Sequence, residues 1–214
     1  MTGKPESIVG ELLARHGRLY AEDAGIRLAD RPGPLYQLLV LATLLSAPIT
    51  AETAVAAARE LFAAGYRSPK AMSEASWQDR VDALGRGHYR RYDERTATML
   101  GDGAELLAGK WHGDLRKLRG DAGGIASRLT EFPGVGPTGA GIFLREVQEV
   151  WPGVAPYVDA KVTSGAHRVR LPADRESLAG LLAASGQPAR LAAALVRVSL
   201  SQRAASEVTA SVRD

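Results

Sequence analysis

The stretch that decides the fold is Leu129-Thr130-Glu131-Phe132-Pro133-Gly134-Val135-Gly136-Pro137-Thr138-Gly139-Ala140. It predicts the end of one helix, a tight turn and the start of a second helix, within a helical hairpin that extends over about 124–150. The two glycines of the turn allow backbone conformations that other residues avoid, and they let the backbone approach a surface closely. Phe132 and Val135 are apolar, so we expect them to fix the turn to the core.

The backbone of this turn predicts an anion site. Around Gly134, Val135 and Gly136 there is little side chain to cover the N–H groups, which can therefore point at a phosphate oxygen. The helix that starts near Thr138 adds the positive end of its dipole. Such a turn would hold a sugar–phosphate chain without reading bases. The alternative is an ordinary helical hairpin that happens to contain Gly-x-Gly.

The rest of the chain also has helical periodicity. Apolar residues from Leu35 to Leu45 occupy every face of a helix, which is typical of a buried central helix. Further helices are expected over 176–184 and 188–200, and Trp77 and Trp111 are expected in the core. We therefore predict an all-α, two-lobed fold. One lobe is a helical bundle over 33–150 that includes the hairpin, and the second combines 1–32 with 151–214.

Composition excludes several kinds of site. The 214 residues include no cysteine, which rules out disulfides, a thiol nucleophile and thiolate-held iron–sulfur clusters. The four histidines are scattered, so we expect no metal site built from side chains. A net charge of +3 permits a polyanionic partner without requiring one. No apolar run approaches the roughly 20 residues of a membrane span, and Met1–Glu6 lacks a signal-peptide stretch, so we expect a cytoplasmic monomer.

Three segments of the chain occur in an order typical of one family. Leu41–Thr50 comes first, Gly87-His88-Tyr89 second, and the hairpin is followed by Tyr157-Val158-Asp159-Ala160-Lys161-Val162. From about residue 35 to 172 the chain thus resembles the endonuclease III branch of the helix-hairpin-helix DNA glycosylase superfamily. The resemblance implies a two-lobed glycosylase fold and a nucleoid-associated protein. It also implies double-stranded DNA as partner, with a damaged or mispaired base flipped into a cleft between the lobes.

The sequence departs from this family at four points. Thr138 stands where the bifunctional members have a lysine, Pro48 replaces the glutamine that enters the DNA stack, and Lys161 replaces a histidine. The C-terminal four-cysteine loop is absent, so we expect no iron–sulfur cluster. A monovalent cation at the hairpin backbone is the one cofactor that the resemblance leaves open.

Asp159 falls on the catalytic aspartate of the family. Breaking an N-glycosidic bond gives the sugar oxocarbenium character, which a nearby carboxylate stabilises while it orients or deprotonates the attacking water. Asp159 follows the helix-breaking stretch 151–156 and precedes a predicted helix. A plain helix N-cap is therefore the alternative, and one side chain could serve both purposes.

Thr138 and Lys161 bear on what such a site can do. Strand cleavage by β-elimination needs an amine that forms a Schiff base with the abasic sugar, and threonine cannot supply one. We therefore predict a monofunctional base-excision-repair glycosylase that releases a base and stops. Lys161 as a replacement nucleophile, which would make the protein an abasic-site lyase, is one alternative. Residues i and i+2 of a helix do not share a face, so a phosphate contact or a solvated lysine is favoured for Lys161.

Further candidates for contact with DNA lie elsewhere. Pro48 could act as an apolar wedge between base steps, or it simply ends a helix. The set His88, Tyr89, Arg91 and Tyr92 could hold an extruded base, or it is a helix start with a solvated charged face. Arg145, close to the hairpin, is predicted to contact a phosphate. A second alternative for the whole protein is a non-catalytic helix-hairpin-helix DNA-binding protein.

Overall fold

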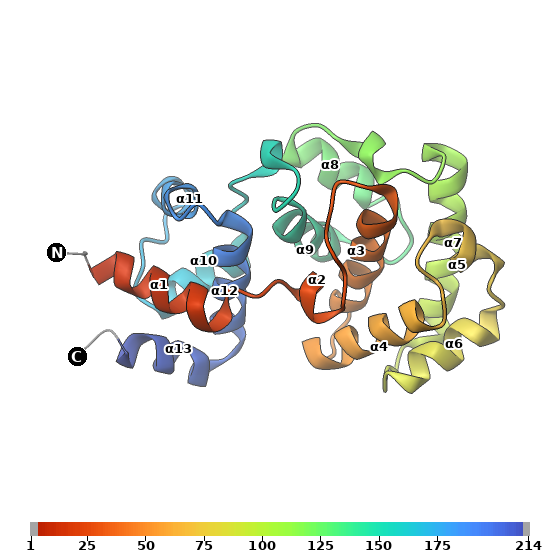
Figure 1. Ribbon diagram of the computed structural model, residues 1–214, viewed down its shortest axis with the longest axis horizontal. Coiled ribbons are helices and arrows are strands. Elements are labelled where there is room, and N and C mark those ends of the chain that lie inside the picture. The colour runs from red at the N-terminus through yellow and green to blue at the C-terminus, as the bar shows by residue number, and fades with distance from the viewer. Residues whose placement is uncertain (1–3, 212–214) are drawn as a thin grey trace. The chain divides into compact units, whose positions relative to one another are not determined.

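The computed structural model describes residues 4–211, and in this range every regular element is a helix and no strand occurs (Figure 1). This confirms the all-α prediction. Residues 21–144 form one compact unit, here called the central unit. The described residues up to Tyr20 and those from Arg145 onward form a second, the terminal unit. The predicted lobes, divided at 33 and 151, include residues 1–3 and 212–214, which lie outside the described range, and the predicted division itself stays a prediction.

The helices follow one another with short connections. In chain order they are α1 (Lys4–His16), α2 (Tyr20–Asp23), α3 (Pro32–Leu45), α4 (Ala51–Ala63), α5 (Pro69–Glu74), α6 (Trp77–Arg86), α7 (Asp93–Trp111), the 3-10 helix η1 (Leu115–Leu118), α8 (Ala122–Leu129), α9 (Pro137–Val147), the 3-10 helix η2 (Pro152–Val154), α10 (Ala160–Arg168), α11 (Arg175–Ala184), α12 (Pro188–Leu200) and α13 (Gln202–Ala210). Helices α3 to α8 belong to the central unit, and α1 and α10 to α13 belong to the terminal unit.

Helix α3 is the centre of the central unit, as its pattern predicts. Leu35, Leu38, Leu41 and Leu44 are fully buried, so apolar side chains on every face of α3 contact neighbouring helices. Short polar side chains begin the surrounding helices. The Thr50 hydroxyl, for example, accepts a hydrogen bond from the backbone N–H of Thr53 at 3.2 Å and so caps α4.

The prediction for Trp77 is wrong. Trp111 is buried as expected, but Trp77 is 42% exposed because it is the first residue of α6, where its indole N–H donates to the Thr98 hydroxyl at 3.1 Å. A charged residue reaches the interior instead. Arg80 is buried, and its guanidinium donates to the backbone carbonyls of Met72, Ala75 and Ala97. These three hydrogen bonds offset the cost of burying its charge.

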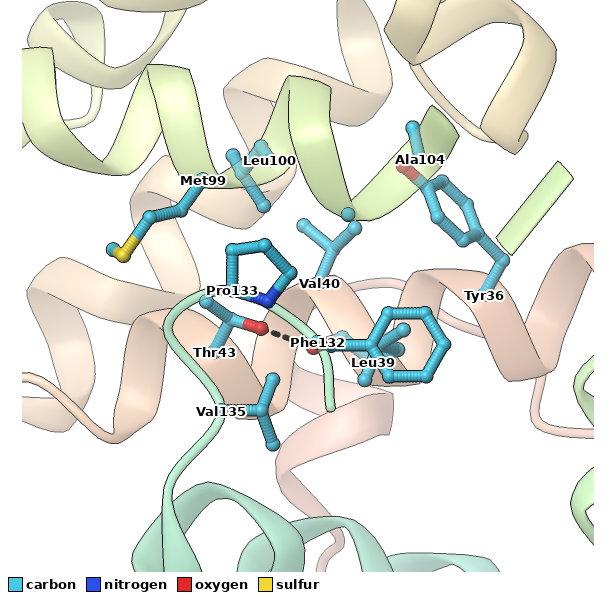
Figure 2. Close-up of a pocket in the computed structure, with 11 residues that line it drawn as sticks. Tyr36, Leu39, Val40, Thr43, Met99, Leu100, Ala104, Phe132, Pro133 and Val135 are labelled. Carbon is cyan, nitrogen blue, oxygen red and sulfur yellow. Dashed lines mark hydrogen bonds between the residues drawn. The ribbon is translucent and has the colours of Figure 1, made fainter. Parts of the chain in front are cut away.

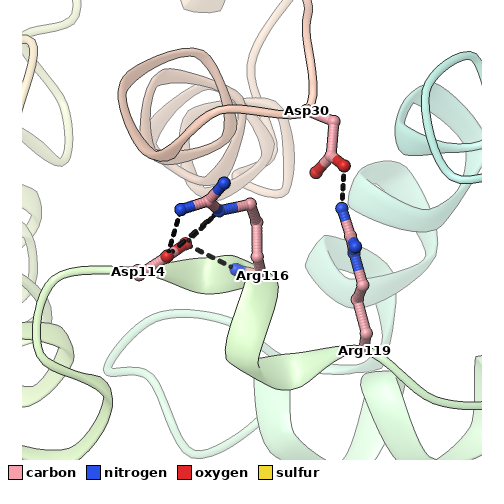
Figure 3. A network of polar contacts seen from close by, with 4 residues as sticks. All are labelled: Asp30, Asp114, Arg116 and Arg119. Carbon is pink, nitrogen blue, oxygen red and sulfur yellow. Dashed lines mark hydrogen bonds and ion pairs between the residues drawn. The ribbon is translucent and has the colours of Figure 1, made fainter.

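Surface ion pairs lie at both ends of η1, and that of Arg119 reaches the segment before α3. Asp114 caps η1, accepting from the Arg116 backbone N–H at 3.0 Å, and its carboxylate also binds the Arg116 guanidinium (Figure 3). Arg119 pairs with Asp30, which precedes α3. Both arginines are largely exposed, so these pairs orient the loop more than they stabilise the fold.

The core of the terminal unit is built on α10 and α12. Gly165 of α10 lies so close to α12 that a Cβ at this position would stand 2.0 Å from the Leu195 carbonyl oxygen. Around this contact lie the buried side chains of α1, α10, α11, α12 and α13, among them Leu12, Val162, Leu178, Leu195 and Val208. Because Asp159 immediately precedes α10, this packing places the candidate carboxylate.

Candidate functional site

The hairpin forms as the sequence predicts, from α8, a turn over 130–136, and α9. Gly134 has φ +81°, a left-handed conformation that glycine adopts without steric cost. The turn closes on itself, because the N–H of Val135 donates to the Phe132 carbonyl at 3.0 Å. This N–H is therefore used inside the turn. The amides of Gly136, Thr138 and Gly139 are the ones that lack an intrahelical acceptor, because Pro137 has no N–H and the N–H of Ala140 donates to the Gly136 carbonyl at 3.0 Å.

Buried apolar contacts fix the turn to the central unit. Phe132 stacks on Trp111 with ring centroids 5.2 Å apart, and Val135 is buried. Figure 2 shows the turn residues facing side chains of α3 and α7 around a pocket of about 20 Å³, roughly the space of one water molecule. The pocket is lined mainly by apolar residues, including Leu39, Val40, Met99 and Leu100. The pocket is too small to hold a base. The apolar contacts around it instead fix the turn to α3 and α7.

The anchored turn exposes three of the four hairpin residues that the sequence selects for a phosphate, and the selection of Val135 is wrong, because Val135 is buried and its N–H is bonded inside the turn. Gly134, Gly136 and Thr138 are exposed, whereas their neighbours Val135 and Gly139 are buried. Gly134 packs closely against α7, since a Cβ at this position would stand 2.7 Å from the Met99 sulfur. Thr138 is the second residue of α9.

The loop between α3 and α4 begins beside the hairpin. A Cβ on Gly139 would lie 3.6 Å from the Ser46 Cβ and 3.8 Å from the Ala42 carbonyl oxygen. Pro48 is exposed in this loop, three residues beyond the end of α3 at Leu45. The loop that carries the predicted wedge position thus starts beside the hairpin within the central unit.

The four predicted base-pocket residues do not share one environment. Tyr89 is buried at 2% exposure, and its hydroxyl accepts a hydrogen bond from the Thr96 hydroxyl at 3.4 Å. Burial raises the pKa of the Tyr89 hydroxyl, and its ring belongs to the core. His88 and Arg91 are exposed, and the Arg91 guanidinium lies 5.4 Å from the ring centre of the half-buried Tyr92. These three still present side-chain surface to a ligand.

Asp159 caps α10. One carboxylate oxygen, Oδ1, accepts the backbone N–H groups of Lys161 and Val162 at 3.0 Å each. The other oxygen, Oδ2, pairs with the Arg145 guanidinium. The Asp159 side chain is 20% exposed and that of Arg145 is 12% exposed. Arg145, predicted to face DNA, is therefore turned toward the candidate carboxylate.

Gln148 holds the segment before Asp159 against the end of α9. This buried side chain donates to the Arg145 carbonyl at 2.9 Å and accepts the backbone N–H of Tyr157 at 3.0 Å. Burial raises the pKa of the Tyr157 hydroxyl, and the charge of Asp159 adds to this effect while Arg145 opposes it. Between Gln148 and Tyr157 the chain contains a cis peptide bond before Pro156.

The sequence did not predict the ion pair between Arg145 and Asp159 or the buried polar residues that follow Arg145 in the chain. Gln148 and Glu146 are both buried, and the Glu146 carboxylate accepts the backbone N–H of Tyr20 at 3.2 Å. The available signal was the polar run Arg145-Glu146 and Gln148 at the end of an otherwise apolar helix. Lys161, by contrast, is exposed at the second position of α10. The turn over 130–136 lies in the central unit and Asp159 in the terminal unit.

The described residues show no metal cluster and no membrane span. Within 4–211, no three His, Cys, Asp or Glu side chains gather as metal ligands. In the same range, no helix is both long and apolar enough to span a membrane.

The chain was compared with known families, proteins and structures. No family model matches it, and no curated protein matches its sequence. Among solved structures, a trapped endonuclease III–DNA covalent intermediate, the estranged-adenine complex, is similar with a TM-score of 0.48 and 19% identity. The match covers 74% of this chain and 70% of that chain. Similarity at this level does not decide function, which has to be argued from the residues.

Proposed function

We propose that this protein is a monofunctional DNA glycosylase of the base-excision-repair type, acting on double-stranded DNA with a damaged or mispaired base. The observation that carries the proposal is the carboxylate of Asp159, held by three donors at the start of α10. The same chain carries the exposed turn of Gly134 and Gly136. A carboxylate near a sugar and a backbone anion site near a phosphate are the two groups that base removal requires.

The reaction would be hydrolysis of the bond between the sugar C1′ and the base nitrogen. Water adds to C1′, and the C1′–N electron pair leaves on the base nitrogen. One water proton ends on the base, and the remaining hydroxyl stays on the sugar. Asp159 would stabilise the positive charge that develops at C1′ and orient the water. Because water is the nucleophile, the products are a free base and an intact strand with an abasic site.

The residues at the lyase position support a reaction that stops at base release. Thr138 carries no amine, so it cannot form the Schiff base on which β-elimination depends. Lys161 donates its backbone N–H to Asp159 and is exposed in the first turn of α10. A phosphate contact is the role that we propose for its side chain.

The central unit would supply contacts with the DNA backbone. The amides of the exposed residues Gly136 and Thr138 offer donors to a phosphate, and Thr138 also offers a hydroxyl. Pro48, exposed on the adjoining loop, would be an apolar wedge. His88, Arg91 and Tyr92 remain candidates for the base.

A monovalent cation at the hairpin remains part of the proposal. The carbonyls of Phe132 and Gly136 accept the N–H groups of Val135 and Ala140, and each carbonyl oxygen has a second lone pair. Carbonyl oxygens suit a hard cation. A cation held there would supply positive charge beside a phosphate.

Single-turnover base release tests the proposal. Excess protein is incubated with duplexes that each contain one damaged or mispaired base, and released bases are identified by mass spectrometry. We expect one substrate class to react, with Asp159→Asn reducing the rate by at least about a hundred-fold and leaving DNA affinity nearly unchanged. Asp174→Asn is the matched control, because Asp174 also caps a helix of the terminal unit, accepting from the Ser177 N–H at 2.9 Å.

Two other outcomes would replace the proposal. Duplex binding without release of any base would identify a non-catalytic DNA-binding protein. A covalent adduct trapped by borohydride on an abasic duplex, and lost in Lys161→Ala, would identify a lyase that uses Lys161.

A further inference from the structure

The contacts of the Asp159 carboxylate come from two directions. The first turn of α10 supplies the N–H groups of Lys161 and Val162, both to Oδ1. The end of α9 supplies Arg145, to Oδ2. The torsion that turns an aspartate carboxylate about its last bond is broad and has no strong intrinsic preference. The two amide donors both bind Oδ1 and leave the carboxylate free to rotate about this bond. The ion pair between Arg145 and Oδ2 stops that rotation.

A helix cap in this chain does not need an arginine. Asp174 caps α11 through hydrogen bonds from Ser177, and no ion pair of Asp174 is described within residues 4–211. At Asp159 an arginine that is only 12% exposed has been added. Removing a guanidinium from water is costly. The extra partner therefore serves something other than capping.

Arg145 is also not required to hold the segment in place. Gln148 already bridges the end of α9 and the residue two before Asp159, through the Arg145 carbonyl and the Tyr157 N–H. The backbone of the segment is thus fixed without the Arg145 side chain. What that side chain adds is confined to the second carboxylate oxygen.

We propose that Arg145 is a positioning residue that fixes the orientation of the Asp159 carboxylate, rather than a ligand of DNA phosphates. This inference rests on the proposed function, because orientation matters only if Asp159 meets a reacting sugar. A misplacement of about 1 Å in a catalytic group can cost a hundred-fold in rate. Loss of the Arg145 donor is therefore expected to slow base release about ten- to hundred-fold.

Three variants test this inference. Arg145→Met removes the donor and keeps a long side chain, and Arg145→Lys keeps a charged donor. Arg190→Met is the matched control, because Arg190 also belongs to the terminal unit and also forms an ion pair with a carboxylate, that of Glu149 at 3.4 Å. For each variant the single-turnover rate, the DNA dissociation constant with its salt dependence, and the thermal unfolding midpoint are measured.

We expect Arg145→Met to lower the rate about ten- to hundred-fold, with a dissociation constant within about two-fold of wild type and an unchanged salt slope. Arg145→Lys should recover most of the rate, and Arg190→Met should retain it. In an Asp159→Asn background, Arg145→Met should cause no further loss, because both changes act on one group.

Several results would overturn the inference. If Arg145→Met reacts at the wild-type rate while Asp159→Asn is inactive, only this inference fails. A weakened dissociation constant with the salt slope reduced by about 0.9 would make Arg145 a phosphate ligand instead. An equal loss in folded Arg145→Lys and Arg145→Met would show that the donor to Oδ2 is not what matters. A wild-type protein that releases no base would remove the proposed function, and this inference with it.

Discussion

Gly165→Ala is a severe test of how α10, and with it Asp159, is placed. A Cβ at residue 165 would stand 2.0 Å from the Leu195 carbonyl oxygen and 2.6 Å from its carbon, where real Cβ contacts essentially never fall below 3.0 Å. Both atoms belong to the backbone of α12, so neither can turn away. Helices α10 and α12 must therefore separate by about 1 Å.

The expected cost follows from this displacement. Overpacking a core typically costs about 1–3 kcal/mol, and a rigid backbone contact puts Gly165→Ala at the upper end of that range. For a protein of this size, about 3 kcal/mol lowers the thermal midpoint by roughly 6–12 °C. Because Asp159 immediately precedes α10, we also expect base release to slow by more than ten-fold in protein that is still folded.

Thermal and denaturant unfolding measure the first effect, and the single-turnover assay measures the second. Gly180→Ala, in α11, is the matched control, because a Cβ there meets open space. It should be neutral or stabilise by up to about 1 kcal/mol through helix propensity. If Gly165→Ala has the stability of Gly180→Ala, the close packing of α10 on α12 is refuted.

Three further outcomes are expected. Gly134→Ala should destabilise the fold by at least about 1–2 kcal/mol, because φ is +81° there. It should also weaken duplex binding in an anisotropy titration. Equal stability of Gly134→Ala and Gly136→Ala would contradict this reasoning. Tyr36→Phe should raise the unfolding free energy by about 1 kcal/mol, because the buried Tyr36 hydroxyl has no partner among the described residues; a destabilised variant would count against it. Burial lowers the pKa of His16, so the unfolded chain takes up the proton first and denaturant unfolding should show stability falling as pH drops below about 6.5. His16→Gln should flatten that slope, and an unchanged slope would refute the reasoning.

The hairpin could be predicted because its causes are local. The left-handed Gly134 and the apolar Phe132 and Val135 specify the turn within a few residues of sequence. Asp159 was also predictable as a cap, since it lies between a Pro/Gly-rich stretch and a helix. In these segments the backbone conformation follows from residues that are neighbours in the chain.

Side-chain direction could not be predicted in the same way. Arg145 turns toward Asp159, Tyr89 turns into the core, and Trp77 stays near the surface. Each outcome depends on a contact made by tertiary packing, with residues 14 positions away for Arg145, 7 for Tyr89 and 21 for Trp77. The sequence shows that an arginine or a tyrosine is present, but it does not show which residue that side chain contacts in the folded protein.

The two hypotheses for Asp159 that the sequence left open are not exclusive, and the geometry shows how they can be separated. The cap uses only Oδ1, while Oδ2 faces Arg145. Asparagine and aspartate cap helices about equally well, so Asp159→Asn can keep both amide bonds at Oδ1, while it replaces the charged Oδ2 with an NH2 group that cannot accept from Arg145. If Asp159 is nothing more than a cap, Asp159→Asn protein that is still folded should release the base at the wild-type rate, whereas a residue that stabilises a cationic sugar should not tolerate the exchange. The neutral side chain therefore distinguishes the structural role from the chemical one at a single position.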